Sequence, residues 1–388
     1  MTRTYLDYNA TAPLRPEARA AMVDALAAVG NASSVHAEGR AAHARIEAAR
    51  AEVARLVGGV AKLVTFTSGG TEANTTVLTP EWTRAGKPHR ADVLLHGATE
   101  HPSVSAGGRF QKEAVRPIPV DDGGIVDLAS LKAMLLQADR EEKRALVSVM
   151  LANNETGAVQ PVAEVARIAH ERGAIVHTDA AQAAGRIAED IAALGVDALT
   201  LAAHKIGGPQ GVGAIVRARD DLTFAPLLTG GGQERRLRAG TENVAAIAGF
   251  GAAARAALAD LADKPGRWAE WRDRLAAIIA AERPVTVFSA GVDRLPQTLS
   301  VAVEGIPAET LVIALDLQGV AVSSGAACSS GKVSTSAVLA AMGVPPSQAK
   351  TAIRLSLGWD STEDDLHSFA KAWRTVLKHI ASGETEAA

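Results

Sequence analysis

The fold is decided by residues 162–179, which read VAEVARIAHERGAIVHTD. Apolar side chains recur at helical spacing over Val162–Arg172, and a short apolar run, Ala174–His177, follows directly. This order is typical of a helix that returns the chain to a buried strand of a parallel sheet. A carboxylate, Asp179, stands just beyond the predicted strand.

The same alternation extends in both directions from this stretch. Further candidate strands are Leu63–Thr67, Asp92–Leu95, Ala145–Met150 and Ala198–Leu201. Continuous apolar strands separated by helices indicate an α/β fold with a mostly parallel sheet covered on both faces. Because ligands bind beyond the carboxyl ends of such strands, the polar residues that follow each strand are candidates for a site.

The pattern changes near Thr241. An alanine-rich helical stretch reaches Ala281 with a break near 264–266, and strands are predicted at Thr298–Val303, Val320–Ser323 and Ala352–Leu357. A last helix is predicted to start at Ser361, capped with Asp364. We therefore expect a large cofactor-binding domain over residues 16–250 and a smaller α+β domain made of residues 1–15 and 251–388.

Composition excludes several classes of protein. The 388 residues carry 40 Lys+Arg against 43 Asp+Glu, a formal charge of −3, so no basic excess argues for nucleic acid. No apolar run reaches the ~18 residues of a membrane helix, and the first residues lack the apolar core of a secretion signal. The lone cysteine, Cys328, forms neither an intrachain disulfide nor a thiolate metal site by itself. We expect a cytoplasmic protein.

A glycine-containing loop follows the predicted strand Leu63–Thr67. It reads Ser68-Gly69-Gly70-Thr71-Glu72-Ala73-Asn74 and leads into a helix, so its N–H groups and hydroxyl suit an anion. The plain alternative is a tight turn with a threonine N-cap. Residues 249–254 fit a dinucleotide pattern, but they lie within a helical run and are discounted.

A lysine and an aspartate end two strands of the predicted sheet. Asp179 follows Ala174–His177, and Lys205 follows Ala198–Leu201. A lysine there can form a Schiff base and an aspartate can hold a protonated pyridine nitrogen, which together with an anion cradle are the anchors of pyridoxal 5'-phosphate. A surface lysine and a capping aspartate are the alternatives for either residue alone.

Several motifs, in order along nearly the whole chain, resemble the cysteine desulfurases, and most closely their iron–sulfur cluster assembly branch. They are Tyr5-Leu6-Asp7-Tyr8-Asn9-Ala10-Thr11, the Ser68–Asn74 loop, Ala98–His101, Asn153–Gly157, His177–Gln182, His204-Lys205, Gly230–Arg235, Arg238–Asn243 and Ser323–Gly331. The resemblance implies the class V aminotransferase family, with a seven-stranded large domain of pyridoxal-phosphate fold type I.

The resemblance also implies roles for individual residues. Lys205 would hold the cofactor and later move the substrate α-proton, while Asp179 would face the pyridine nitrogen and Gln182 the phenolic oxygen. His101 would stack on the ring and help proton transfer; read alone, it is a helix-entry residue before Pro102. The phosphate would be bound by Gly70, Thr71 and His204, and by Thr241 from the other subunit of a homodimer.

The substrate side is assigned in the same way. Arg354, in a strand of the small domain, would clamp the α-carboxylate of L-cysteine with its fork, and Asn154 would assist where substrate meets cofactor. A surface ion pair is the alternative for Arg354. Cys328 lies in a serine- and glycine-containing stretch, which argues against the plain alternative of a small buried core cysteine and favours an accessible thiol. The resemblance implies that this thiol is a nucleophile that takes sulfur as a persulfide and passes it to a protein acceptor, such as an iron–sulfur scaffold.

One departure from the family pattern stands two residues before His204. The family has serine there and this chain has Ala202, which removes one hydroxyl contact and predicts weaker cofactor retention, by about 1 kcal/mol. A selenocysteine lyase or an aminotransferase of the same fold is the alternative reading. A catalytically silent scaffold for sulfur-transfer partners is another, and a nicotinamide dehydrogenase lacks a usable fingerprint.

Overall fold

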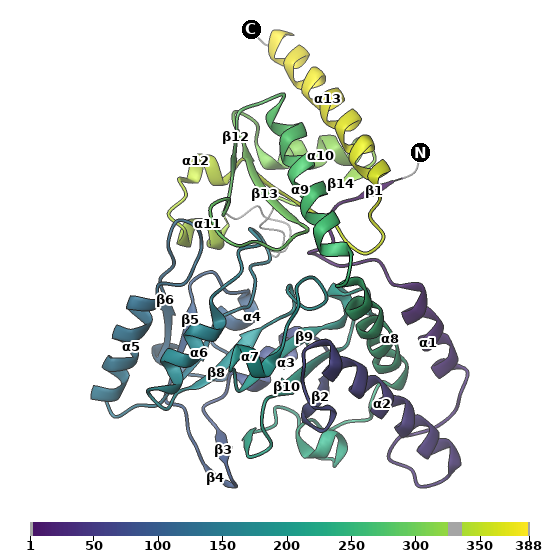
Figure 1. Ribbon diagram of the computed structural model, residues 1–388, viewed down its shortest axis with the longest axis vertical. Coiled ribbons are helices and arrows are strands. Elements are labelled where there is room, and N and C mark those ends of the chain that lie inside the picture. The colour runs from purple at the N-terminus through teal and green to yellow at the C-terminus, as the bar shows by residue number, and fades with distance from the viewer. Residues whose placement is uncertain (1–2, 325–335, 387–388) are drawn as a thin grey trace.

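The computed structural model describes residues 3–324 and 336–386. Its centre is a seven-stranded sheet in the order β2-β10-β9-β8-β7-β5-β6, flanked by helices (Figure 1). Six strands run in one direction and β10 runs against both of its neighbours, so the sheet is mixed. The predicted α/β class and seven-stranded sheet are confirmed.

The strands of the central sheet are short and buried. They are β2 (Val64–Thr67), β5 (Val93–Gly97), β6 (Val115–Ile118), β7 (Ala145–Ser148), β8 (Ile175–Asp179), β9 (Ala198–Ala202) and β10 (Gly213–Arg217). The longer helices around it are α1 (Pro16–Leu26), α2 (Ala37–Leu56), α3 (Gly70–Val77), α5 (Leu128–Arg140), α6 (Val162–His170) and α8 (Val244–Asp260), with the short α4 (Pro102–Ser105) and α7 (Ile191–Leu194). A small sheet of β3 (Trp82–Arg84), β4 (Lys87–Pro88) and β11 (Leu222–Phe224) adjoins it.

Alternate residues of the central strands face opposite sides of the sheet. In β7, Val147 belongs to one hydrophobic core and Leu146 to another. The first core is closed by α2, α5, α6 and α8, and the second by α3, α4 and the β3–β11 pair. Both faces are therefore covered, as the continuous apolar strands predict.

A second group of elements packs around a core of its own. It comprises β1 (Thr4–Tyr5) paired with β14 (Val320–Ala321), the antiparallel sheet β12 (Val285–Val287), β13 (Thr298–Val303) and β15 (Ala352–Ser356), and α9 (Lys264–Ala280), α10 (Ala308–Leu317), α11 (Ala337–Ala341), α12 (Pro346–Ala349) and α13 (Glu363–Glu386). Leu6 joins this core, as the assignment of the N-terminus to the small domain predicts. The domain boundaries themselves stay a prediction, and α8 runs unbroken across residue 250.

Two helix starts differ from the sequence predictions. The break falls before Lys264, because Pro265 occupies the first turn of α9, where its missing N–H costs no helical hydrogen bond. The last helix begins at Glu363, directly after Thr362, whose backbone N–H and hydroxyl both donate to the Asp365 carboxylate, while Ser361 accepts from the backbone N–H of Gly358. The predicted Ser361–Asp364 cap is therefore wrong by one residue.

The glycines of residues 249–254 allow close packing of helices, which agrees with the decision to discount the dinucleotide pattern there. A Cβ on Gly251 would lie 2.5 Å from the Cα of Ala49 in α2, and one on Gly249 would lie 2.7 Å from Met22 in α1. Glycine thus allows α8 to lie close against both helices. Among the described residues no single helix is long and apolar enough to cross a bilayer; α8 and α9 reach that length and apolarity only together, and they are bent by 77°.

Candidate active site

Five segments that carry candidate residues leave the central sheet at one edge. β2 leads to the Ser68–Asn74 loop, β5 to His101 and β7 to Asn154, while β8 ends at Asp179 and β9 leads to Lys205. These strands are parallel to one another, so their carboxyl ends meet at the same edge. The topology therefore gathers the candidates that the sequence separates by more than a hundred positions.

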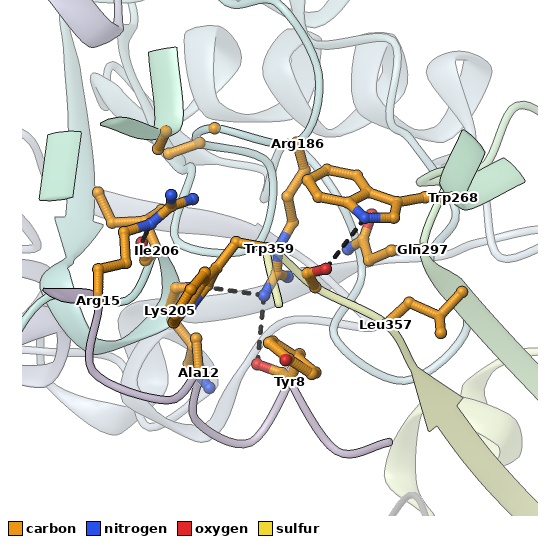
Figure 2. A pocket seen from close by; sticks show the side chains of 14 residues that line it. Tyr8, Ala12, Arg15, Arg186, Lys205, Ile206, Trp268, Gln297, Leu357 and Trp359 are labelled. Atoms are coloured by element: carbon orange, nitrogen blue, oxygen red, sulfur yellow. Dashed lines mark hydrogen bonds between the residues drawn. The ribbon is translucent and has the colours of Figure 1, made fainter. Parts of the chain in front are cut away.

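Lys205 ends a 3-10 turn, η3 (Ala203–Lys205), that follows β9 directly. Its Nζ donates to the carbonyl oxygens of Asn9, at 2.5 Å, and Ala10, at 3.0 Å. The N-terminal segment thus passes beside the lysine. Figure 2 shows Lys205 in a cavity lined from both domains, with Tyr8 of that segment on one side and Trp268 and Gln297 on the other.

A buried arginine stands behind the lysine. Arg186 donates to the carbonyl oxygens of Tyr8 and Lys205 (Figure 2). It also donates to the side chains of Asn9 and Gln182. Burial, with the charge of Arg354 adding to it, lowers the pKa of Arg186 to about 9. The amide of Gln182 also donates to the Asn9 carbonyl, at 3.0 Å, so Gln182 is held rigidly beside Lys205.

Asp179 and His101 share a polar neighbourhood. The Asp179 carboxylate is buried and accepts from the side-chain amide of Asn74 at 2.7 Å and from the backbone N–H of Ala181 at 2.9 Å. His101 is the N-cap of α4, so the helix-entry reading is right, yet the same ring senses the charges of Asp179 and Lys205. Burial lowers the pKa of His101, with Lys205 lowering it further and Asp179 opposing the shift.

The start of α3 lacks a side-chain cap. Gly69 is its N-cap residue, and Gly70 and Thr71 form the first turn, so the alternative reading of a threonine N-cap is wrong. A Cβ built on Gly70 would lie 3.3 Å from the Cβ of Ala202, which places Ala202 against the helix start. His204 lies nearby in η3 with its Nδ1 3.2 Å from the Thr11 hydroxyl, and burial lowers its pKa to about 4.

Arg354 reaches the site from β15 of the small domain. Its Nη1 donates to the Asn154 carbonyl oxygen at 2.9 Å, and its Nη2 bonds Asp7 at 2.7 Å, so the structure brings Arg354 and Asn154 together. The side chain is buried, and its Nε has no hydrogen-bond partner among the described residues. The surface ion pair considered for Arg354 is therefore wrong: Arg354 is buried, and the side chain of its partner Asp7 is only 19% exposed.

Two predicted residues are not placed with the others. Thr241 is exposed in the segment between η4 (Gln233–Arg236) and α8. Cys328 lies outside the described residues. The described residues on either side of its stretch are anchored at the site, since Ser323 pairs with Arg354 through backbone hydrogen bonds and Ser336 donates to Glu155, the neighbour of Asn154.

Sequence reasoning missed the residues that hold the candidates in place. Asn74 bonds Asp179, and Asn9 bonds Lys205 and Gln182, yet neither was singled out. A signal existed for Asn74, because a residue four positions after Gly70 lies one helical turn further along the same face. No comparable signal pointed to Asn9, because its partners depend on how the N-terminal segment crosses between domains.

Comparisons with known proteins add to this geometry. Residues 4–369 match the family described as aminotransferase class-V. A cysteine desulfurase of Cereibacter sphaeroides is 43% identical over 98% of this chain and 97% of its own length. Among solved structures, a NifS-like protein of Rickettsia africae covers 97% of this chain and 99% of its own at a TM-score of 0.84 and 32% identity. Another, titled SspA in complex with cysteine, covers 91% and 98% at a TM-score of 0.74 and 25% identity.

Proposed function

Since the chain belongs to the class-V aminotransferases, and among them to the cysteine desulfurases, we propose that it takes sulfur from L-cysteine onto Cys328 with pyridoxal 5'-phosphate held by Lys205. L-alanine is the second product. The arrangement of Lys205, Asp179 and the uncapped start of α3 at one sheet edge carries this proposal.

The residues present suit this cofactor. The first turn of α3 offers backbone N–H groups without a side-chain cap, and a Cβ at Gly70 would crowd the space beside Ala202. A buried carboxylate and a lysine stand at neighbouring strand ends, which is the donor set that a phosphorylated pyridine aldehyde requires. When bound, the cofactor would act as an electron sink for bond breaking at the substrate's α-carbon.

Each residue then has a defined task. Lys205 would hold the cofactor and take the α-proton, Asp179 would hold the ring nitrogen, and Gln182 would bond the phenolic oxygen. His101 would stack on the ring and assist proton movement. Gly70, Thr71 and His204 would bind the phosphate, with Thr241 contributed by a second copy of the chain; Ala202 adds no hydroxyl to this set, which would weaken retention.

Arg354 provides a fork for the substrate's α-carboxylate. Its guanidinium lies beside Asn154, its Nε lacks a partner among the described residues, and a carboxylate accepts two parallel hydrogen bonds from such a group. Binding there would orient the amino acid between the small domain and the sheet edge, with Asn154 beside it.

Cys328 supplies the nucleophile. It stands five positions after Ser323, so even a fully extended chain keeps its Cα within about 18 Å of Ser323, which is itself paired with Arg354. The Cys328 thiolate attacks the substrate sulfur, the sulfur–sulfur bond forms as the carbon–sulfur bond breaks, and the carbon takes a proton to become the methyl group of alanine. The enzyme is left as a persulfide.

Mass analysis of the purified protein after addition of L-cysteine tests this proposal. We expect a gain of one sulfur on the peptide that contains Cys328, and no gain in Cys328→Ala. An aminotransferase would keep its turnover in Cys328→Ala, and a silent scaffold would bind no chromophore that depends on Lys205. Alanine release by Cys328→Ala at the rate of the unmodified protein would refute the proposed nucleophile.

The assembly proposed here is a homodimer that delivers sulfur to a protein acceptor such as an iron–sulfur scaffold. Exposed apolar side chains gather on and after α1, at Val23, Leu26 and Val29, which suits a face covered by a second copy. Light scattering at micromolar concentration tests the dimer. The cytoplasm remains the proposed compartment, because a catalytic thiol must stay reduced.

A further inference from the structure

A line of buried polar side chains runs across the sheet beneath the candidate site. It links three central strands to α3 and α4 through Ser148 of β7, His177 of β8, Thr200 of β9, Asn74 of α3 and Ser103 of α4. Two of the candidate residues, Asp179 and His101, are bonded to this line, and we call the five residues of the line together with these two the array. The middle members, His177, Thr200 and Asn74, are at most 1% exposed.

The direction of each hydrogen bond follows from the chemistry of Asn74. The Asp179 carboxylate accepts from the backbone at one oxygen, so Asn74 turns its amide nitrogen toward the other, at 2.7 Å. The second amide hydrogen goes to the Ser103 hydroxyl oxygen, at 2.9 Å. The amide oxygen of Asn74 is then left to accept from the Thr200 hydroxyl, at 2.5 Å.

These directions fix the tautomers of two histidines. The Thr200 hydroxyl donates its only hydrogen to Asn74, so its oxygen can only accept from His177. His177 therefore donates from Nε2 to the Thr200 hydroxyl oxygen, at 3.1 Å, and accepts from the Ser148 hydroxyl at Nδ1, at 2.9 Å. At the other end the Ser103 hydroxyl donates to Nδ1 of His101 at 2.7 Å, and the Ser103 backbone N–H also points to that atom, at 3.1 Å. Both rings therefore carry their hydrogen on Nε2.

The burial of the rings agrees with neutral forms. Burial lowers the pKa of His177 to about 4, against the opposing charge of Asp179, and burial is also the main cause that lowers the pKa of His101. A neutral ring keeps one nitrogen as an acceptor, which the donors Ser148 and Ser103 require.

We propose that Asn74 is a positioning residue of the reaction, which joins Asp179 and His101 in one array and is itself held by Thr200. The array keeps the Asp179 carboxylate aimed along the edge of the sheet, and it makes His101 present an N–H group, at Nε2, to the site. His101 then meets the reacting groups as a hydrogen-bond donor. The assignment of Asp179 and His101 to the cofactor rests on the proposed function; the hydrogen-bond directions do not.

The directions are tested on the cofactor-free protein. With ¹⁵N-labelled histidine, two-bond ¹H–¹⁵N correlation spectra near neutral pH should show His101 and His177 as neutral Nε2–H tautomers, with the signals identified in His101→Gln and His177→Gln. An Nδ1–H tautomer or a charged ring at either position would overturn the array. This measurement stands even if the protein proves not to bind pyridoxal 5'-phosphate, an outcome that would refute the proposed function alone.

The positioning role is tested by a matched pair of substitutions. Thr200→Val removes the hydroxyl that holds Asn74, whereas Thr178→Val removes an equally buried hydroxyl that bonds the Val149 carbonyl outside the array. Loss of about one net hydrogen bond should weaken the dissociation constant for pyridoxal 5'-phosphate about fivefold in Thr200→Val. Thr178→Val should stay within twofold, and Thr200→Ser should restore binding.

Equal losses in the two valine variants would mean that the hydroxyl of Thr200 is merely structural, and would refute the role of Asn74. Asn74→Ala provides the second check, because it removes the donors to both Asp179 and Ser103. If it folds with an unchanged unfolding midpoint and binds the cofactor as tightly as the unmodified protein, the proposal is equally overturned.

Discussion

Replacing Arg354 by lysine should raise the KM for L-cysteine and leave kcat nearly unchanged. Lysine keeps the positive charge that faces Asp7 in the buried pair, so no unpaired carboxylate is created. It lacks the planar fork, however, so a substrate carboxylate keeps one hydrogen bond where arginine gives two. A hydrogen bond to a charged group contributes about 1.5–3 kcal/mol, which corresponds to an increase in KM of about 10- to 150-fold.

Arg50→Lys is the matched control. Arg50 is as buried as Arg354 and likewise bonds a buried carboxylate, that of Glu234, and a backbone carbonyl, that of Val64; its Nε also bonds the Glu47 carboxylate. Steady-state alanine formation over a range of L-cysteine concentrations should give an unchanged KM for Arg50→Lys, with both variants compared at equal cofactor content. A KM for Arg354→Lys within twofold of the unmodified protein, or a loss confined to kcat, would refute the carboxylate clamp.

Three further substitutions follow from the structure. Glu234→Gln breaks a bidentate buried pair with Arg50 and should lower the free energy of unfolding by about 3–5 kcal/mol in urea titrations. The apolar pair Arg50→Met with Glu234→Leu should recover only part of this loss, because it leaves the buried Phe66 N–H and Val64 carbonyl without their partners. Burial raises the pKa of the Glu100 carboxyl well above its usual value, so the unfolded chain loses this proton first and folded stability falls as pH rises above about 4.5. Glu100→Gln should therefore gain stability relative to the unmodified protein as pH rises above about 4.5, and a difference independent of pH would contradict this. Gly213→Ala would place a Cβ 2.5 Å from the carbonyl carbon of Gly69, and the displaced loop should bind pyridoxal 5'-phosphate at least about fivefold more weakly; Gly232→Ala, with open space around it, should not.

The sequence predicted the residues at strand ends well because of a simple geometric rule. A parallel sheet brings the carboxyl ends of its strands to one edge, so Asp179 and Lys205 could be placed together from the order of apolar runs alone. The same reasoning found the helix that follows Ser68-Gly69. Sequence reasoning could not show that the N-cap of this helix is Gly69 and not a threonine. The position of the N-cap depends on the backbone at Gly69, which has a φ of 159° where the loop meets β10.

Residues that hold others in place were beyond sequence reasoning. Asn74 and Thr200 are ordinary members of a helix and a strand, 126 positions apart, and only the packing of α3 on the sheet turns them into a bonded pair. In the sequence alone, a polar residue within a helix or strand cannot be distinguished from one that is merely tolerated among apolar neighbours. Their hydrogen bonds depend on which strands are neighbours, and this is a property of the sheet order and not of local spacing.

The N-terminal segment shows why the two halves of the site belong together. β1 pairs with β14 of the small domain, and within the next few residues Asp7 bonds Arg354, 347 positions away, while the Asn9 carbonyl accepts from Lys205, 196 positions away. One short stretch thus contacts both the proposed substrate anchor and the proposed cofactor anchor. Residues 8–10 form a turn, and two residues span at most about 7 Å even in an extended chain, so these contacts fix the spacing between the small domain and the sheet edge. The distance at which Arg354 can present a carboxylate to Lys205 is therefore set by the segment that the motif Tyr5–Thr11 encodes.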